Sequence, residues 1–142
     1  MTALTPPAAD APAEEWGALG VSIPGHQWPW WVDRRARGVC LPGYVRRHQA
    51  PEWAWMEDIS ECSMLDDIAP DPDDPATAGC LLALLGQRCL VRILPREGLP
   101  LEIVIPSGMM TDGRPHRVSG INLGRACIAA AAAIGRWPGG AE

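Results

Sequence analysis

The sequence predicts an α+β domain in which an antiparallel sheet of about four to five short strands is packed by two α-helices, at about 75–86 and 122–135. Three observations lead to this prediction: one strongly capped helical segment, one alanine-rich helical segment, and short β-rich runs joined by brief turns. The 142 residues are 47% hydrophobic and 20% charged, as expected for one folded domain.

The first helix, predicted over residues 75–86, has the clearest local signal. Asp74 can cap its free backbone N–H groups, and Pro75 suits the first helical position. An apolar stripe at i, i+3 and i+4 then follows, formed by Leu81, Leu84 and Leu85. Gly86 is expected to end the helix. Gly79 has low helix propensity and predicts the close approach of another element.

The second helix, over about 122–135, has a one-sided apolar stripe and a run of alanines at 129–133. The stripe comprises Leu123, Cys127, Ala130, Ile134 and Trp137. Small side chains let a helix backbone pack closely on a sheet. Residues 138–140, Pro-Gly-Gly, are expected to stop this helix.

The predicted strands are short β-rich runs, namely 39–41, 44–46, 53–59, 89–94, 101–105 and 116–119. The runs at 89–94 and 101–105 flank a Pro/Gly-containing turn and predict a β-hairpin. Within the second of them, Leu101, Ile103 and Ile105 share one face, so we expect that face to pack on the core.

The chain ends are expected to differ in order. Residues 1–15 form a flexible Ala/Pro-rich lead-in, and residues 16–142 form the single domain. The first 13 residues lack the basic and apolar regions of a secretory signal. The longest aliphatic run, 126–134, is nine residues and about half of what a bilayer requires, so no membrane association is expected. Five cysteines without a CxxC pair predict reduced structural thiols, with no metal and no cofactor.

Charge is unevenly distributed along the chain. The net charge of −5 argues against a basic nucleic-acid binder, and sequence-specific DNA binding is not expected. That value conceals a +5 block at 34–47 beside a −9 block at 52–74. The two blocks predict local faces that a partner or ligand could recognise.

The stretch 70–85, PDPDDPATAGCLLALL, resembles a helix-start motif, PDxxDPATxGCLLAL, of small proteins from tailed bacteriophages. A Leu-Pro-Gly turn at 41–43 and the alanine-rich helix at 123–134 extend the resemblance over about residues 24–136, although only 70–85 is specific. The Trp-rich segment has no counterpart. The resemblance implies a phage or prophage origin, an accessory role, and the host bacterial cytoplasm as the location. It implies no activity.

A Trp/Arg segment is the first candidate site. Tryptophans followed by arginines can stack bases and hold phosphates, although Trp can equally replace the missing Phe in the core. The residues concerned are Trp28, Trp30, Trp31, Arg34, Arg35 and Arg37.

The start of the second helix is another candidate. Glycines and free N–H groups there could bind an anion with the help of nearby arginines, or the segment is simply a capped helix. The side chains concerned are Arg114, Arg117, Asn122 and Arg125.

An acidic partner face is the third candidate. Its carboxylates could occupy a partner's basic groove, or they could form a solvated surface; no EF-hand loop is present. They belong to Glu57, Asp58, Glu61, Asp66, Asp67 and Asp71.

No catalytic motif occurs, and no catalytic residue is predicted. The leading hypothesis is a non-catalytic phage-encoded accessory protein that binds a host component, such as a host protein, and modulates or evades bacterial defence. One alternative is a protein that binds and sequesters a small nucleotide-like ligand. A second is a small enzyme with a Cys nucleophile. The oligomeric state stays open, with a homodimer among the possibilities.

Overall fold

The computed structural model describes residues 4–25, 41–46, 52–56, 67–95 and 97–139. It confirms the α+β class, with three helices and two antiparallel three-stranded sheets among these residues in place of two helices and one sheet. The helices are α1 (Ala13–Ser22), α4 (Pro75–Leu85) and α5 (Leu123–Ile134), with a 3-10 turn, η2 (Ser107–Met109). The strands are β1 (Gly43–Arg46), β2 (Trp53–Met56), β3 (Asp67–Pro70), β4 (Leu90–Ile93), β5 (Leu101–Ile105) and β6 (His116–Gly120).

Each sheet has its own strand order. In the first sheet, β1 lies between β2 and β3. In the second, β5 lies between β4 and β6, so the predicted hairpin forms and places Val91 opposite Ile103. β5 has the predicted bounds, and its side chains alternate as expected: Ile103 and Ile105 are fully buried.

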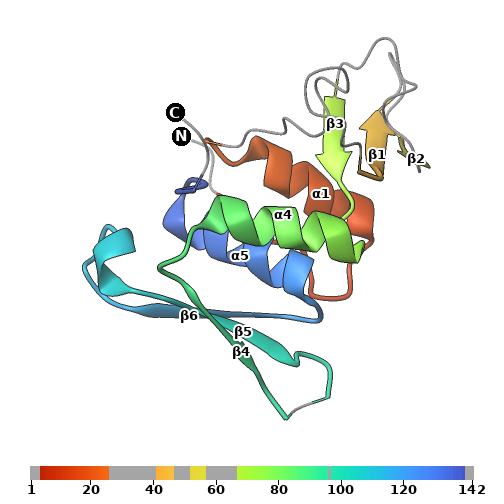
Figure 1. The fold of residues 1–142 in the computed structure, drawn as a ribbon. Helices are drawn as coiled ribbons and strands as arrows, with labels where there is room; N and C mark the ends of the chain where they lie inside the picture. Colours follow the sequence, from red (N-terminus) through yellow and green to blue (C-terminus); the bar gives the residue numbers. More distant parts are fainter. Residues whose placement is uncertain (1–3, 26–40, 47–51, 57–66, 96, 140–142) are drawn as a thin grey trace.

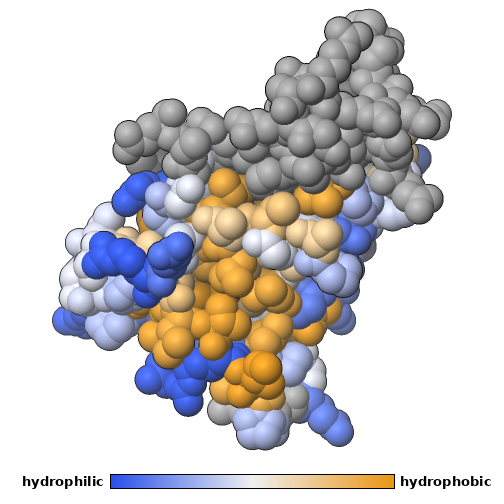
Figure 2. All heavy atoms as spheres, viewed as in Figure 1, coloured by the Kyte–Doolittle hydropathy of each residue, from blue (hydrophilic) through white to orange (hydrophobic). Residues whose placement is uncertain are grey.

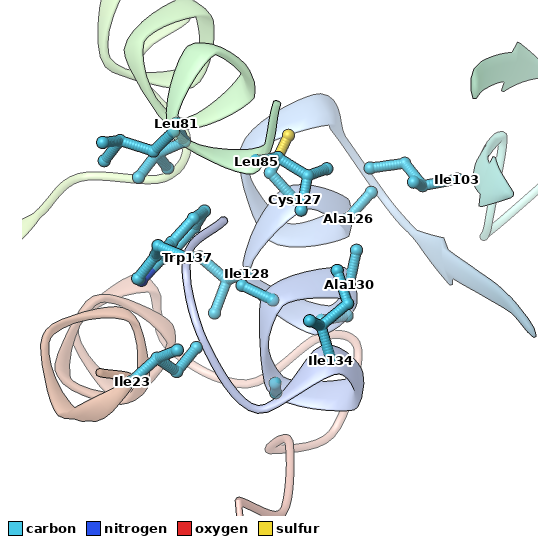
Figure 3. Packing of buried hydrophobic residues seen from close by; sticks show 14 of the residues in the cluster. Ile23, Leu81, Leu85, Ile103, Ala126, Cys127, Ile128, Ala130, Ile134 and Trp137 are labelled. Carbon is cyan, nitrogen blue, oxygen red and sulfur yellow. The ribbon is translucent and has the colours of Figure 1, made fainter. Parts of the chain in front are cut away.

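Helix α5 occupies the centre of the molecule. Figure 1 shows it between α1 and the β4–β5–β6 sheet, with α4 in front. Cys127, Ile128 and Ala130 are fully buried. Its N-cap is Asn122, and it ends at Gly135, whose left-handed conformation (φ 91°) closes the last turn before the Pro-Gly-Gly segment is reached. Trp137 follows the helix, and its ring packs against Ile128 (Figure 3).

Helix α1 was not predicted, because residues 1–15 were expected to form a flexible lead-in and because Gly17 and Gly20 have low helix propensity. The glycines allow close packing instead. A Cβ on Gly17 would overlap the carbonyl oxygen of Pro70, at the end of β3. α1 begins at Ala13, so the expected boundary between lead-in and domain at 15/16 lies inside a helix. Strand β3 was also missed, because it is short and ends in proline.

Helix α4 confirms the predicted cap and corrects one detail. Asp74 Oδ2 accepts a hydrogen bond from Thr77 N–H at 2.9 Å, and Gly86 N–H bonds back to Leu82 O. Gly79, however, is exposed, and no atom lies within 4 Å of the position of a Cβ. The expected close approach at Gly79 was therefore wrong; the buried face of α4 is the one with Leu81 and Leu85.

Within the described ranges, no helix has the length and apolar character needed to cross a membrane.

Candidate functional site

Many of the predicted site residues lie outside the described residues. This holds for the whole Trp/Arg segment, Trp28, Trp30, Trp31, Arg34, Arg35 and Arg37, and for Glu57, Asp58, Glu61 and Asp66 of the acidic face. For Asp67 the structure describes the backbone, which belongs to β3. The positions available for a site are therefore Asp71 and the start of α5.

The start of α5 is a capped helix with a buried arginine. Asn122 Oδ1 accepts a hydrogen bond from Arg125 N–H at 3.0 Å, and Asn122 Nδ2 donates to Asp73 Oδ1 at 2.7 Å. The Arg125 side chain donates from Nε and Nη2 to the two carboxylate oxygens of Asp73, at 2.9 and 3.0 Å. Its Nη1 donates to the carbonyls of Ala9 and Ala11, at 3.0 and 2.5 Å.

We call Asp73, Asn122, Arg125 and the two carbonyls the arginine clamp. It joins three distant segments: the N-terminal stretch, the loop after β3, and α5. The hydrogen bond from Arg125 is the main reason that the pKa of Asp73 is lowered, and the hydrogen bond from Asn122 adds to this. Arg125 is 5% exposed, so its guanidinium is bound within the protein.

Arg114 and Arg117 lie elsewhere. Both are exposed, and neither side chain takes part in the arginine clamp. The clamp therefore brings Asn122 and Arg125 together and leaves the other two arginines apart from them. The anion site at this helix start stays a prediction, and its exposed residues are Arg114 and Arg117.

A second group of side chains lies on the β2–β1–β3 sheet. Trp55 of β2 is 49% exposed, and its indole Nε1 donates to Asp71 Oδ2 at 2.7 Å. Asp71 is buried, and its other oxygen, Oδ1, accepts from Asp73 N–H at 3.0 Å. A buried carboxylate thus fixes the edge of an exposed aromatic ring, and Asp73 connects this group to the arginine clamp.

Tyr44 lies next to Trp55, because the two residues are opposite each other in the β1–β2 register. The pKa of Tyr44 is raised to about 12, first by burial and then by the nearby charges of Asp71 and of Glu14 on α1. We call Glu14, Tyr44, Trp55 and Asp71 the acidic–aromatic surface. It combines two carboxylates with a large apolar ring that is held in place.

The cysteines that the structure describes are poorly suited to nucleophilic attack. Burial raises the thiol pKa of Cys80 and of Cys89, and it raises that of Cys127 to about 12. These thiols are therefore protonated at neutral pH, whereas a nucleophile needs a thiolate. Cys40 and Cys62 lie outside the described residues.

Metal-ligand clusters were not expected, and the described part of the chain contains no group of three His, Cys, Asp or Glu side chains arranged to hold a metal ion.

Sequence reasoning assigned Asp71 to an acidic partner face, whereas its side chain is buried; its neighbours Trp55, Tyr44 and Glu14 were not predicted. The alternation of Trp53 and Trp55 was the available signal, because it placed both rings on one side of a strand. The link from Trp55 to Asp71 spans 16 residues and needs the folded sheet.

Comparison of the chain with protein-family models, with curated proteins and with solved structures gave no match.

Proposed function

We propose that this protein is a non-catalytic, phage-encoded accessory protein that binds a host protein in the bacterial cytoplasm and modulates or evades host defence. The phage origin and the cytoplasmic setting follow from the resemblance of residues 70–85 to the phage helix-start motif. The binding role rests on one structural observation. Trp55 exposes about half of its surface while a buried carboxylate holds its ring.

An anchored, exposed tryptophan is a common feature of binding surfaces. Interface hot spots are enriched in Trp, because a rigid ring buries a large area at low entropic cost. Here the Asp71 bond at 2.7 Å limits the ring before any partner arrives. The conformational cost of binding at this ring is therefore small.

The charge of the surface indicates the chemistry of the partner. Asp71 bonds directly to the Trp55 ring, and Asp71 and Glu14 are both close enough to Tyr44 to raise its pKa. A cationic side chain could lie over the Trp55 ring and face these carboxylates. The proposed partner therefore presents Arg or Lys at the contact.

The test is a binding measurement with a matched control. The immobilised full chain captures candidate proteins from a bacterial lysate, and the dissociation constant of each purified candidate is then measured. The Trp55→Ala substitution is expected to raise the dissociation constant of the true partner about 30-fold, which is typical of the loss of a hot-spot residue. The control, Leu99→Ala, removes an exposed apolar side chain in the β4–β5 loop and is expected to leave the dissociation constant unchanged.

Two results would contradict the proposal. One is equal binding by wild type and Trp55→Ala for every captured protein. The other is a thermal-shift increase of several degrees with a nucleotide, which favours the sequestering alternative.

A further inference from the structure

Strand β4 is an open edge of the second sheet. Among the strands that the structure describes, β4 pairs with β5 alone, because the strand order is β4–β5–β6. Leu94 N–H donates to Pro100 O at 2.5 Å, which fixes the alternation of the ladder: Leu94, Arg92 and Leu90 bond toward β5. The N–H and C=O groups of Val91 and Ile93 therefore point to the open edge.

The same strand carries the most exposed large apolar side chains in the described residues. Ile93 is 83% exposed and Leu90 is 59% exposed. Figure 1 shows the β4–β5 hairpin extending beyond the helices, and Figure 2 shows apolar atoms continuing from the level of α4 down to it. An exposed apolar edge of this kind is a template for pairing with another strand.

The other edge of this sheet has the protection that β4 lacks. β6 begins directly after Pro115 and carries the exposed charge of Arg117 at its second position. On β4, the one charged residue is Arg92, whose Nη1 lies 3.5 Å from Glu102 Oε1 of the neighbouring strand. Arg92 therefore opposes an approaching strand only where another positive charge lies directly opposite it.

We propose that β4 pairs with β4 of a second copy, forming an antiparallel homodimer with one continuous six-stranded sheet. Two-fold symmetry and the two faces of the sheet leave few registers. Placing Arg92 opposite the partner's Arg92 opposes like charges. Placing Ile93 opposite the partner's Ile93 brings Val91 opposite the partner's Pro95, which lacks an N–H.

The register that avoids both problems has Val91 opposite the partner's Val91 at the two-fold axis. The N–H and C=O of Val91 point to the open edge, so the two residues can exchange both hydrogen bonds. Leu90 then lies opposite the partner's Arg92, and no like charges are directly opposed. A second copy therefore pairs the open backbone groups of this edge, and the stem of the partner's Arg92 can cover Leu90.

The experiment is sedimentation equilibrium of the full chain over a concentration series. We expect a particle of twice the 15.3 kDa chain mass that dissociates on dilution. Val91→Pro removes the central N–H donor without breaking a bond to β5, and it is expected to give a monomer with an unchanged circular dichroism spectrum.

A pair of substitutions at Leu90 tests the register even if Val91→Pro fails to fold. Leu90→Arg places a positive charge opposite the partner's Arg92, and this happens twice in each dimer. It is expected to raise the dissociation constant of the dimer about tenfold. Leu90→Glu places an opposite charge there and is expected to lower it. Leu99→Arg, the same change in the nearby loop, is the control and is expected to have no effect.

A wild-type chain that stays monomeric throughout the series would overturn the proposal and leave this edge to a strand of a different protein. A dimer unaffected by Leu90→Arg would overturn it as well, because it would form through another surface.

Discussion

The two sheets have the same number of strands and the same antiparallel pairing, but different interactions hold them. The β4–β5–β6 sheet packs by aliphatic burial: Ile103 and Ile105 are fully buried, and Figure 3 shows Ile103 pointing toward Ala126 of α5. The β2–β1–β3 sheet depends more on aromatic and polar contacts. Arg46 lies 5.7 Å from the centre of the Trp53 ring, and Trp55 bonds to Asp71.

The difference shows how each sheet relates to the sequence. Alternating aliphatic residues define both the strand and its buried face, so they can be recognised locally. A contact such as Trp55 to Asp71 involves side chains that are compatible with many structures, and it exists only once the sheet has formed.

The largest expected effect on stability is at the contact between α5 and the loop after β3. This contact links the parts of the molecule that contain the two sheets. A Cβ on Gly124 would overlap the carbonyl oxygen of Pro72, and neither backbone can move easily. Gly124→Ala is expected to lower the free energy of unfolding by about 3 kcal/mol or more, measured by urea denaturation. The control, Gly79→Ala in α4, has open space and is expected to raise it by up to about 1 kcal/mol. Similar losses for both would mean that α5 does not approach this loop.

A direct comparison of the sheets comes from their buried aliphatic residues. Ile103→Ala is expected to cost about 3 kcal/mol of unfolding free energy, because it leaves a cavity under α5. Val45→Ala in β1 removes less apolar surface and is expected to cost about 1.5 kcal/mol. A larger loss for Val45→Ala in the same denaturation experiment would reverse the comparison.

The arginine clamp makes a contribution to the free energy of unfolding that depends on pH. Arg125→Met is expected to lower the unfolding free energy by about 2 kcal/mol at neutral pH, because the carbonyls and Asp73 lose their donors. The folded-state pKa of Asp73 lies below the usual 3.8, so its contribution is present above the unfolded carboxyl pKa and is lost as pH falls through the folded value.

Arg125→Met should therefore have a weaker acid dependence than wild type below about pH 4. Urea denaturation of both proteins across that range measures this. Parallel pH profiles would show that Asp73 gains nothing from Arg125.

The smallest effect is expected in the exposed loop before β6. Asp112 Oδ1 accepts a hydrogen bond from Arg114 N–H at 3.0 Å, and Oδ2 lies 2.8 Å from His116 Nε2. These contacts, the Arg114 bond foremost, lower the pKa of Asp112. An NMR titration of His116→Gln should show that this pKa rises but stays below its ordinary value. A full return to that value would mean that the Arg114 bond contributes nothing.

Prediction from sequence succeeded and failed for identifiable reasons. α4 was predicted because Asp74, Pro75 and Gly86 are local capping signals, and β5 because its alternation is strict. α1 was missed because the glycines that let it touch Pro70 also reduce its helix propensity. At the candidate site, charge alone assigned Asp71 to an acidic partner face, whereas the folded structure buries its carboxylate and bonds it to Trp55.

The amino-acid sequence by itself determined the α+β class, the two capped helices and the β4–β5 hairpin, because each depends on residues that are close together in the chain. Only the tertiary structure decided that Arg125 would be enclosed by Asp73 and by the carbonyls of Ala9 and Ala11. These two carbonyls are more than a hundred residues away from Arg125 in the sequence. The tertiary structure also decided which strand edge would remain open. Hydrogen bonds and strand pairings between segments far apart in the sequence are set by packing of the whole chain, and no local pattern encodes them.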